Sequence, residues 1–216
     1  MTDFLWTRPD ADPVATVLLA HGAGAPMDST FMEKLAGALA KEGMAVARFE
    51  FGYMAQRRKG GGKRPPPKAE KLIGEFQTAL QTLMKEADGP ILIGGKSMGG
   101  RVSAMLAGGA SLPGRVKGVA CYGYPFHPTG KADAPWRMEP LEGAQRPVLI
   151  QQGERDPFGS QEELGSLTLP SHVTISYLGD GNHDFGPRGN HPATLDGNIH
   201  IAARNTVEFA NRLLSV

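Results

Sequence analysis

Three polar side chains of the kinds that cleave acyl bonds each follow an apolar run of the chain. Ser97 lies at the centre of GKSMG, residues 95–99, directly after the apolar run 90–94 and before a helical pattern. A G-x-S-x-G sequence at a strand-to-helix turn is typical of a nucleophilic serine, because the turn exposes the hydroxyl and the glycines avoid collisions with nearby backbone. Asp156 and His183 follow two later apolar runs. A histidine can take the hydroxyl proton, and a carboxylate can hold that histidine in the required tautomer.

The letters GKS also end a phosphate-binding loop of the form G-x-x-x-x-G-K-[ST]. The first glycine of that motif would lie seven residues before Ser97, where the chain has Pro90. The intervening residues 91–93 are an apolar run that predicts a buried strand and leaves no room for a loop around phosphates. We therefore expect Ser97 to attack a carbonyl rather than to hold magnesium.

Two acids compete for the role of orienting the histidine. Asp156 is the favoured residue, and Glu154, two positions earlier, is the alternative that the sequence leaves open. Asp180 and Asp184 adjoin His183, and we expect them to cap the loop there.

Apolar runs alternate with helical patterns along the chain. The patterns predict strands at 14–20, 44–51, 90–94, 116–122, 147–152 and 172–178 and helices at 28–43, 69–87, 98–107 and 197–214. Strands that alternate with helices predict an α/β fold with a mostly parallel sheet covered on both faces, and sites in such sheets lie at the carboxyl ends of the strands. Ser97, Asp156, His183 and the turn His21–Gly24 should therefore meet at one rim, with His21 supporting its turn rather than reacting.

Composition narrows the classes of protein. The 216 residues suit a single domain, residues 1–216, and 40% hydrophobic and 21% charged residues are ordinary for a globular protein. A net charge of +1 gives no sign of a nucleic-acid partner, and no run is long enough for a membrane span. The N-terminus has acids and prolines in place of a signal peptide, so we expect a cytoplasmic protein. The single cysteine, Cys121, and the scattered histidines and acids predict neither a metal site nor a cofactor.

The sequence resembles the α/β-hydrolases over essentially its whole length. It is similar in particular to a small group of predicted hydrolases that share HGAG (21–24), an RF-F-YM segment (48–54) and GGKSMGGR (94–101). That group includes bacterial proteins and testis-expressed animal relatives. Gly52 departs from the pattern, where a proline is expected.

The resemblance implies the α/β-hydrolase fold without a sizeable cap, no cofactor, and a catalytic triad of Ser97, Asp156 and His183. The oxyanion would lie between the backbone N–H of Met98 and that of Ala23, with Gly24 as second choice, because the residue after His-Gly usually points its N–H inward in this superfamily.

Two irregular segments flank the expected site. Residues 54–68 form a basic, Gly/Pro-rich loop that could attract an anionic substrate, contact a macromolecule or simply be solvated. Residues 123–145 form a short irregular insert with at most one short helix, which predicts an open site. Five side chains are candidates for contacting the substrate or for ordinary packing: Tyr53, Met54, Arg57, Phe126 and Phe158.

These features predict a serine hydrolase that cleaves a carboxylic ester or thioester of a small molecule through an acyl-enzyme. The alternative is a hydrolase fold that serves as an interaction module and binds a protein partner, since a more distant relative is a subunit of a chromatin acetyltransferase complex that does not resemble an enzyme. The oligomeric state cannot be inferred from the sequence.

Overall fold

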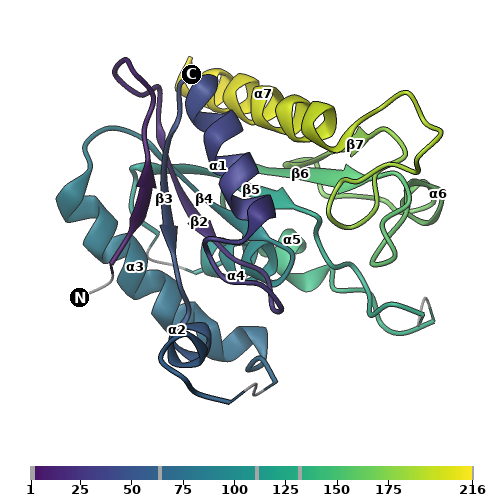
Figure 1. Cartoon of the computed structure of the whole chain (residues 1–216), viewed down its shortest axis with the longest axis horizontal. Coiled ribbons are helices and arrows are strands. Elements are labelled where there is room, and N and C mark those ends of the chain that lie inside the picture. Colours follow the sequence, from purple (N-terminus) through teal and green to yellow (C-terminus); the bar gives the residue numbers. More distant parts are fainter. Residues whose placement is uncertain (1–2, 63–64, 110–111, 131–132, 216) are drawn as a thin grey trace.

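The computed structural model describes residues 3–62, 65–109, 112–130 and 133–215, and these form one sheet of seven strands (Figure 1). The strand order is β1-β3-β2-β4-β5-β6-β7. All neighbouring strands pair in parallel except β1, which pairs antiparallel with β3 at one edge. The strands are β1 (Leu5–Thr7), β2 (Thr16–Ala20), β3 (Ala45–Phe49), β4 (Ile91–Lys96), β5 (Val116–Tyr122), β6 (Val148–Gly153) and β7 (Val173–Leu178).

Helices cover both faces of the sheet (Figure 1). On one face α1 and α7 lie side by side, and α3, α4 and α5 cover the other. The helices are α1 (Thr30–Lys41), α2 (Gly52–Arg58), the short 3-10 helix η1 (Ala69–Leu72), α3 (Ile73–Glu86), α4 (Met98–Ala107), α5 (Glu139–Glu142), α6 (Gln161–Leu164) and α7 (Leu195–Leu214).

The sheet has a hydrophobic core on each face, and the side chains of β2 are shared between the two. Val17 and Leu19 pack in the cluster formed with α1 and α7, while Leu18 and Ala20 pack in the cluster formed with α3 and α4. Side chains alternate between the faces of a strand, so a continuous apolar run is required where both faces are covered. This is the reason that the apolar runs predicted the sheet.

The six predicted strands are confirmed as β2 to β7, and the four predicted helices as α1, η1 with α3, α4 and α7. Strand β1 was not predicted, because three residues at an edge carry too little pattern.

The predicted basic loop 54–68 is a helix at its start, because α2 runs from Gly52 to Arg58. The Gly52 N–H donates to Glu75 Oε2 at 2.6 Å. Proline has no N–H, so the departure from proline at this position allows a bond that links α2 to α3. Lys63 and Arg64 of the predicted loop lie outside the described residues.

The insert 123–145 is described at residues 123–130 and 133–145. Within those stretches the only helix is α5, of four residues. The described insert therefore adds no cap domain over the carboxyl ends of the strands.

Candidate active site

Ser97 lies between β4 and α4 in a backbone conformation that L-amino acids rarely adopt, with φ 51° and ψ −114°. Its N–H donates to the Tyr122 carbonyl at 2.9 Å, and its carbonyl accepts from the Arg101 N–H at 3.1 Å, so the turn is held at both sides. A strained residue of this kind persists only where the surrounding structure imposes it, and such residues gather at functional sites.

The glycines beside Ser97 are required by close backbone contacts. A Cβ on Gly95 would lie 2.6 Å from the Gly99 carbonyl carbon, and a Cβ on Gly99 would lie 2.7 Å from the carbonyl oxygens of Ala20 and His21. Backbone atoms cannot move aside as a flexible side chain can. The expectation that small residues must flank the serine is confirmed.

His183 and Asp156 meet in the structure. His183 Nδ1 lies 2.8 Å from Asp156 Oδ2 and 3.1 Å from Oδ1. The Asp156 carboxylate is fully buried and also accepts from the Phe158 N–H at 2.9 Å. With the imidazole Nδ1–H donating to the carboxylate, Nε2 is left as the acceptor for a proton.

Glu154 has a different partner. Its Oε2 accepts from the Asp180 N–H at 2.6 Å, which fixes the start of the loop that carries His183. Of the two acids that the sequence left open, the structure brings Asp156 to the imidazole and uses Glu154 to hold the loop.

The loop after β7 is anchored by buried polar groups. Asp180, buried and at φ 48°, pairs with Arg155 at 2.7 Å and with Arg188 at 2.6 Å. Hydrogen bonds from Arg188, and to a smaller extent from Arg155, hold the pKa of the Asp180 carboxyl well below its usual range. Asn182 Oδ1 accepts from the Asp184 N–H at 2.9 Å, which closes the turn on which His183 lies.

The loop-capping expectation is confirmed for Asp180 and is wrong for the Asp184 side chain, since Asn182 caps the turn. Asp184 Oδ1 instead lies 3.2 Å from Lys96 Nζ. Sequence reasoning treated Lys96 as the variable position of G-x-S-x-G. The available signal was a lysine at the end of a fully buried strand, because buried lysines are rare unless paired.

Gly123 was also missed. It follows β5 at φ 68°, and a Cβ there would lie 3.2 Å from both Cε1 and Nδ1 of the His183 imidazole. The ring of Phe158 lies near the same imidazole, with centroids 4.4 Å apart. Backbone and aromatic contacts thus limit the positions that the histidine ring can take.

The turn His21–Gly24 is supported by hydrogen bonds from the side chains of His21 and Tyr53. His21 is fully buried, its Nδ1 donates to the Gly22 carbonyl at 2.7 Å, and its Nε2 accepts from the Phe51 N–H at 3.1 Å. Burial lowers the pKa of His21. The Tyr53 hydroxyl donates to the Ala23 carbonyl at 3.0 Å. His21 therefore has the supporting role expected of it, and Tyr53 shares that role.

A pocket of about 510 Å³ joins these parts. Its wall combines the turn after β2, the first turn of α1, the end of β4, and side chains from the loops after β6 and β7. The lining residues are Gly22, Ala23, Gly24, Ala25, Ser29, Thr30, Phe31, Met32, Lys96, Ser97, Phe158, His183 and Asp184. Met98 is the first residue of α4, so its N–H has no partner within the helix.

Four of the expected substrate contacts lie elsewhere. Phe158 lines the pocket, whereas Met54 and Phe126 are buried in the protein and do not reach it. Tyr53 bonds to the turn behind the pocket, and Arg57 lies with its guanidinium 5.6 Å from the Tyr53 ring.

The basic segment is partly neutralised by acids from other elements. Arg58 donates to both carboxylate oxygens of Asp28, at 2.7 and 2.8 Å, and to Glu50 at 2.8 Å. These contacts tie α2 to the loop before α1. The charge of Arg58 is therefore paired with two acids, and Arg58 is not a free attractor of anions.

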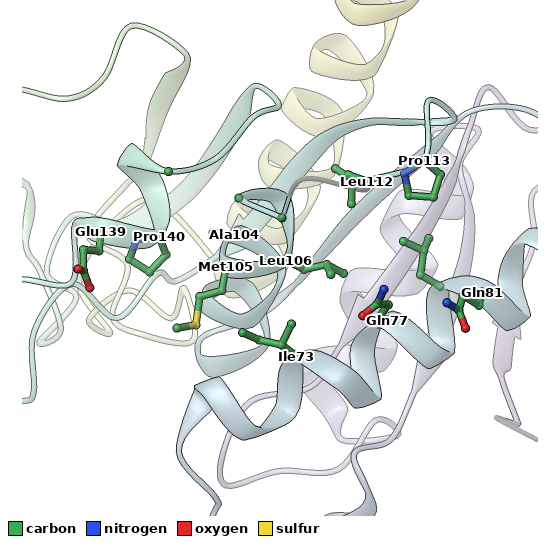
Figure 2. A pocket seen from close by; sticks show the side chains of 14 residues that line it. Ile73, Gln77, Gln81, Ala104, Met105, Leu106, Leu112, Pro113, Glu139 and Pro140 are labelled. Atoms are coloured by element: carbon green, nitrogen blue, oxygen red, sulfur yellow. The ribbon is translucent and has the colours of Figure 1, made fainter.

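A second pocket, of about 580 Å³, lies at the opposite end of α4 from Ser97 (Figure 2). Its lining is mainly apolar and includes Ile73 and Leu80 of α3 and Ala104, Met105 and Leu106 of α4, while its polar side chains are Gln77, Gln81 and Glu139. None of the predicted site residues lies there.

The described residues hold neither a candidate metal site nor a candidate membrane-spanning helix. Among them there is no group of three or more histidine, cysteine, aspartate or glutamate side chains placed to hold a metal ion. None of the described helices is long and apolar enough to cross a membrane.

Comparison with known proteins identifies the family. A family model described as an alpha/beta hydrolase domain matches residues 13–211. The chain belongs to the α/β-hydrolase family. No curated protein matches its sequence.

Solved structures of low identity share the fold. An α/β serine hydrolase homologue from Coxiella burnetii is 19% identical, with a TM-score of 0.64 over 99% of this chain and 90% of the other. An α/β serine hydrolase without a lid from Xanthomonas campestris is 19% identical, with a TM-score of 0.65 over 98% and 88%. A dienelactone hydrolase from Anabaena variabilis is 18% identical, with a TM-score of 0.69 over 94% and 89%. In this α/β-hydrolase the observed sheet, the short insert and the strand-to-helix turn at residues 95–99, called the elbow below, agree with a fold that lacks a lid.

Proposed function

We propose that this α/β-hydrolase is a serine esterase or thioesterase that acts through an acyl-enzyme on Ser97. The observation that carries the proposal is that the strained Ser97 and the His183–Asp156 pair line or adjoin the same pocket. A strained serine alone could be structural, and so could a buried ion pair. Their convergence in one cavity is the arrangement that acyl transfer requires.

The chemistry follows from the proton positions. Ser97 Oγ attacks the acyl carbon while His183 Nε2 takes the hydroxyl proton, and Asp156 stabilises the resulting imidazolium. The tetrahedral intermediate collapses as the bond to the leaving oxygen or sulfur breaks, and His183 returns the proton to that atom. Water then attacks the acyl-enzyme with His183 as base, releasing the acid and restoring the serine.

The oxyanion of each intermediate would be bound by the backbone N–H groups of Met98 and Ala23. Met98 begins α4, where N–H groups lack helical partners and the helix dipole is positive. Donors fixed in this way before reaction stabilise the transition state, and removal of one typically slows the reaction about 100-fold or more. In the described structure the Ser97 hydroxyl makes no hydrogen bond to the imidazole, as is common before substrate binds.

An ester or thioester of a small molecule is the proposed substrate class. The pocket is open and mainly apolar, which suits an acyl group of modest size. Similar structures include an esterase domain from Rhodothermus marinus, 21% identical, and the dienelactone hydrolase, whose names both describe ester cleavage.

Covalent labelling with a fluorophosphonate tests the proposal without a known substrate. Ser97 Oγ would bond to phosphorus as fluoride leaves and His183 takes the proton. We expect the label on the peptide that contains Ser97 in the wild type, and none there in Ser97→Ala or after denaturation. A folded wild type that takes no label would refute the proposal and favour the alternative of a protein-binding module.

A further inference from the structure

An ion pair brackets the two residues proposed to exchange the proton. Lys96 immediately precedes Ser97, and Asp184 immediately follows His183. Lys96 Nζ lies 3.2 Å from Asp184 Oδ1, and both side chains line the pocket. The contact therefore joins the elbow at the end of β4 directly to the loop after β7.

The two partners differ in how firmly they are held. Lys96 is 6% exposed at the end of a strand, with its Nζ 5.3 Å from the Phe31 ring. Its stem lies under the turn after β2, where a Cβ on Gly22 would be 3.6 Å from Lys96 Cγ. The Asp184 side chain is 70% exposed on a turn. Lys96 is thus the fixed point, and Asp184 is the group that it holds.

We propose that Lys96 is a positioning residue whose ion pair with Asp184 aligns His183 with Ser97, so that the reactivity of Ser97 requires Lys96 in its protonated form. This inference rests on the proposed function, because it concerns the same serine and histidine.

Other contacts hold the turn and the His183 ring, and the Lys96–Asp184 ion pair adds a restraint at the residue beside that histidine. Asp180 and Asn182 anchor the two sides of the turn, and Asp156 binds His183 at Nδ1. The contacts of the His183 ring with Asp156 and Phe158 limit its position, but they act on the ring and not on residue 184 beside it. The ion pair between Lys96 and Asp184 restrains the backbone next to His183. Loss of this ion pair should therefore misalign His183 Nε2 without unfolding the loop.

Several charged groups act on the lysine. Burial lowers the pKa of Lys96 below its ordinary 10.5, and the nearby carboxylates of Asp184 and Asp156 act in the opposite direction. His183 is the other titratable group beside the pair, and α1 contributes the Phe31 ring. Deprotonation of Lys96 should therefore break the ion pair on the alkaline side, at a pH below the ordinary lysine value.

Stability should change with the opposite sign. Because the folded pKa is lowered, the unfolded chain holds the proton more tightly between the folded value and 10.5. In that window the free energy of unfolding gains from Lys96 as pH rises. A merely structural lysine would not make the free energy of unfolding rise and the reactivity of Ser97 fall over the same pH range.

The test measures the second-order rate of fluorophosphonate labelling from about pH 7 to about pH 10.5 in wild type, Lys96→Met and Asp184→Asn. We expect a rate about tenfold lower in both variants at neutral pH, since a full 1 Å misplacement would cost roughly 100-fold. The wild type should lose rate on the alkaline side, and Lys96→Met should show no such loss. Asp184→Glu, which restores the charge, should recover part of the rate.

A matched control is the exposed pair Lys34–Asp196, 2.5 Å apart between α1 and α7. Lys34→Met and Asp196→Asn remove the same charges away from the pocket lining and should label as the wild type does. Lys96→Met should unfold in urea at no lower concentration than the wild type, because an apolar group replaces a buried amine.

Two outcomes would overturn the inference alone: wild-type rates in both Lys96→Met and Asp184→Asn, or an alkaline loss that persists in Lys96→Met. A folded wild type that takes no label at any pH would instead refute the proposed function, and this inference with it.

Discussion

The two ends of helix α4 carry pockets of similar size and very different chemistry. The pocket at the Ser97 end measures about 510 Å³. The pocket at the far end, which Figure 2 shows, measures about 580 Å³. The first gathers a strained serine, an imidazole backed by a buried carboxylate, and a buried lysine. The second offers mainly apolar side chains with two glutamines and one glutamate. Size therefore does not distinguish the candidate active site, whereas convergent polar groups held by strained backbone do.

The largest expected effect on the labelling of Ser97 comes from replacing one of the two acids near His183. Asp156→Asn should slow labelling of Ser97 about 10⁴-fold, because the amide would stabilise the wrong tautomer of the imidazole. Glu154→Gln keeps an oxygen that can accept from the Asp180 N–H, so its labelling rate should stay near that of the wild type. Rates of fluorophosphonate labelling measure both. Equal losses in the two variants would mean that the loop anchor matters as much as the imidazole contact.

The glycines of the elbow provide the next test. Gly99→Ala should lower the free energy of unfolding by about 3 kcal/mol, because its Cβ would lie 2.7 Å from two backbone oxygens that cannot yield. Gly74, in α3, is the control, since nothing lies within 4 Å of the position of its Cβ. Gly74→Ala should raise stability by about 0.5 kcal/mol through the entropy of the unfolded chain.

Urea unfolding of both glycine variants gives the comparison. A Gly99→Ala protein as stable as the wild type would show that the elbow tolerates a side chain, which would contradict the close packing described for it.

Occluding each pocket in turn sharpens the contrast between them. Thr30 and Gln77 are both exposed helix residues, and each lines one pocket. Thr30→Trp should slow labelling about tenfold by displacing the probe from the line of attack. Gln77→Trp should leave the rate unchanged. A loss in Gln77→Trp with unchanged stability would reveal coupling between the two ends of α4.

The sequence predicted the sheet and the elbow well, because each depends on local patterns. Buried strands read as apolar runs, and Gly95 and Gly99 must be small for a reason that holds in any such turn. It also indicated the rim on which Ser97, Asp156 and His183 would meet, since the carboxyl ends of parallel strands lie together.

The remaining features depend on contacts between distant segments. The choice of Asp156 over Glu154 is decided by which side chain reaches the imidazole after the turn at β6 folds. The pairing of Lys96 with Asp184 joins residues 88 positions apart, and no local pattern encodes it. Phe126 and Met54 were candidates for contacting the substrate or for ordinary packing, and side-chain direction takes both into the core.

The smallest expected effect concerns His21, which supports the turn behind the Ser97 pocket. Among the described residues, no histidine lines the far pocket. His21 is held neutral by burial, which lowers its pKa from 6.5 in the folded protein. The unfolded chain therefore binds the proton first as pH falls below 6.5. The stability that neutral His21 contributes is fully present above that pH and is lost progressively below it. Urea unfolding of His21→Gln should show a weaker acid dependence than the wild type, because the Gln amide oxygen could still accept from Phe51 without titrating. The same acid dependence in both proteins would mean that protonation of other groups controls this range, and that the turn does not depend on a neutral imidazole.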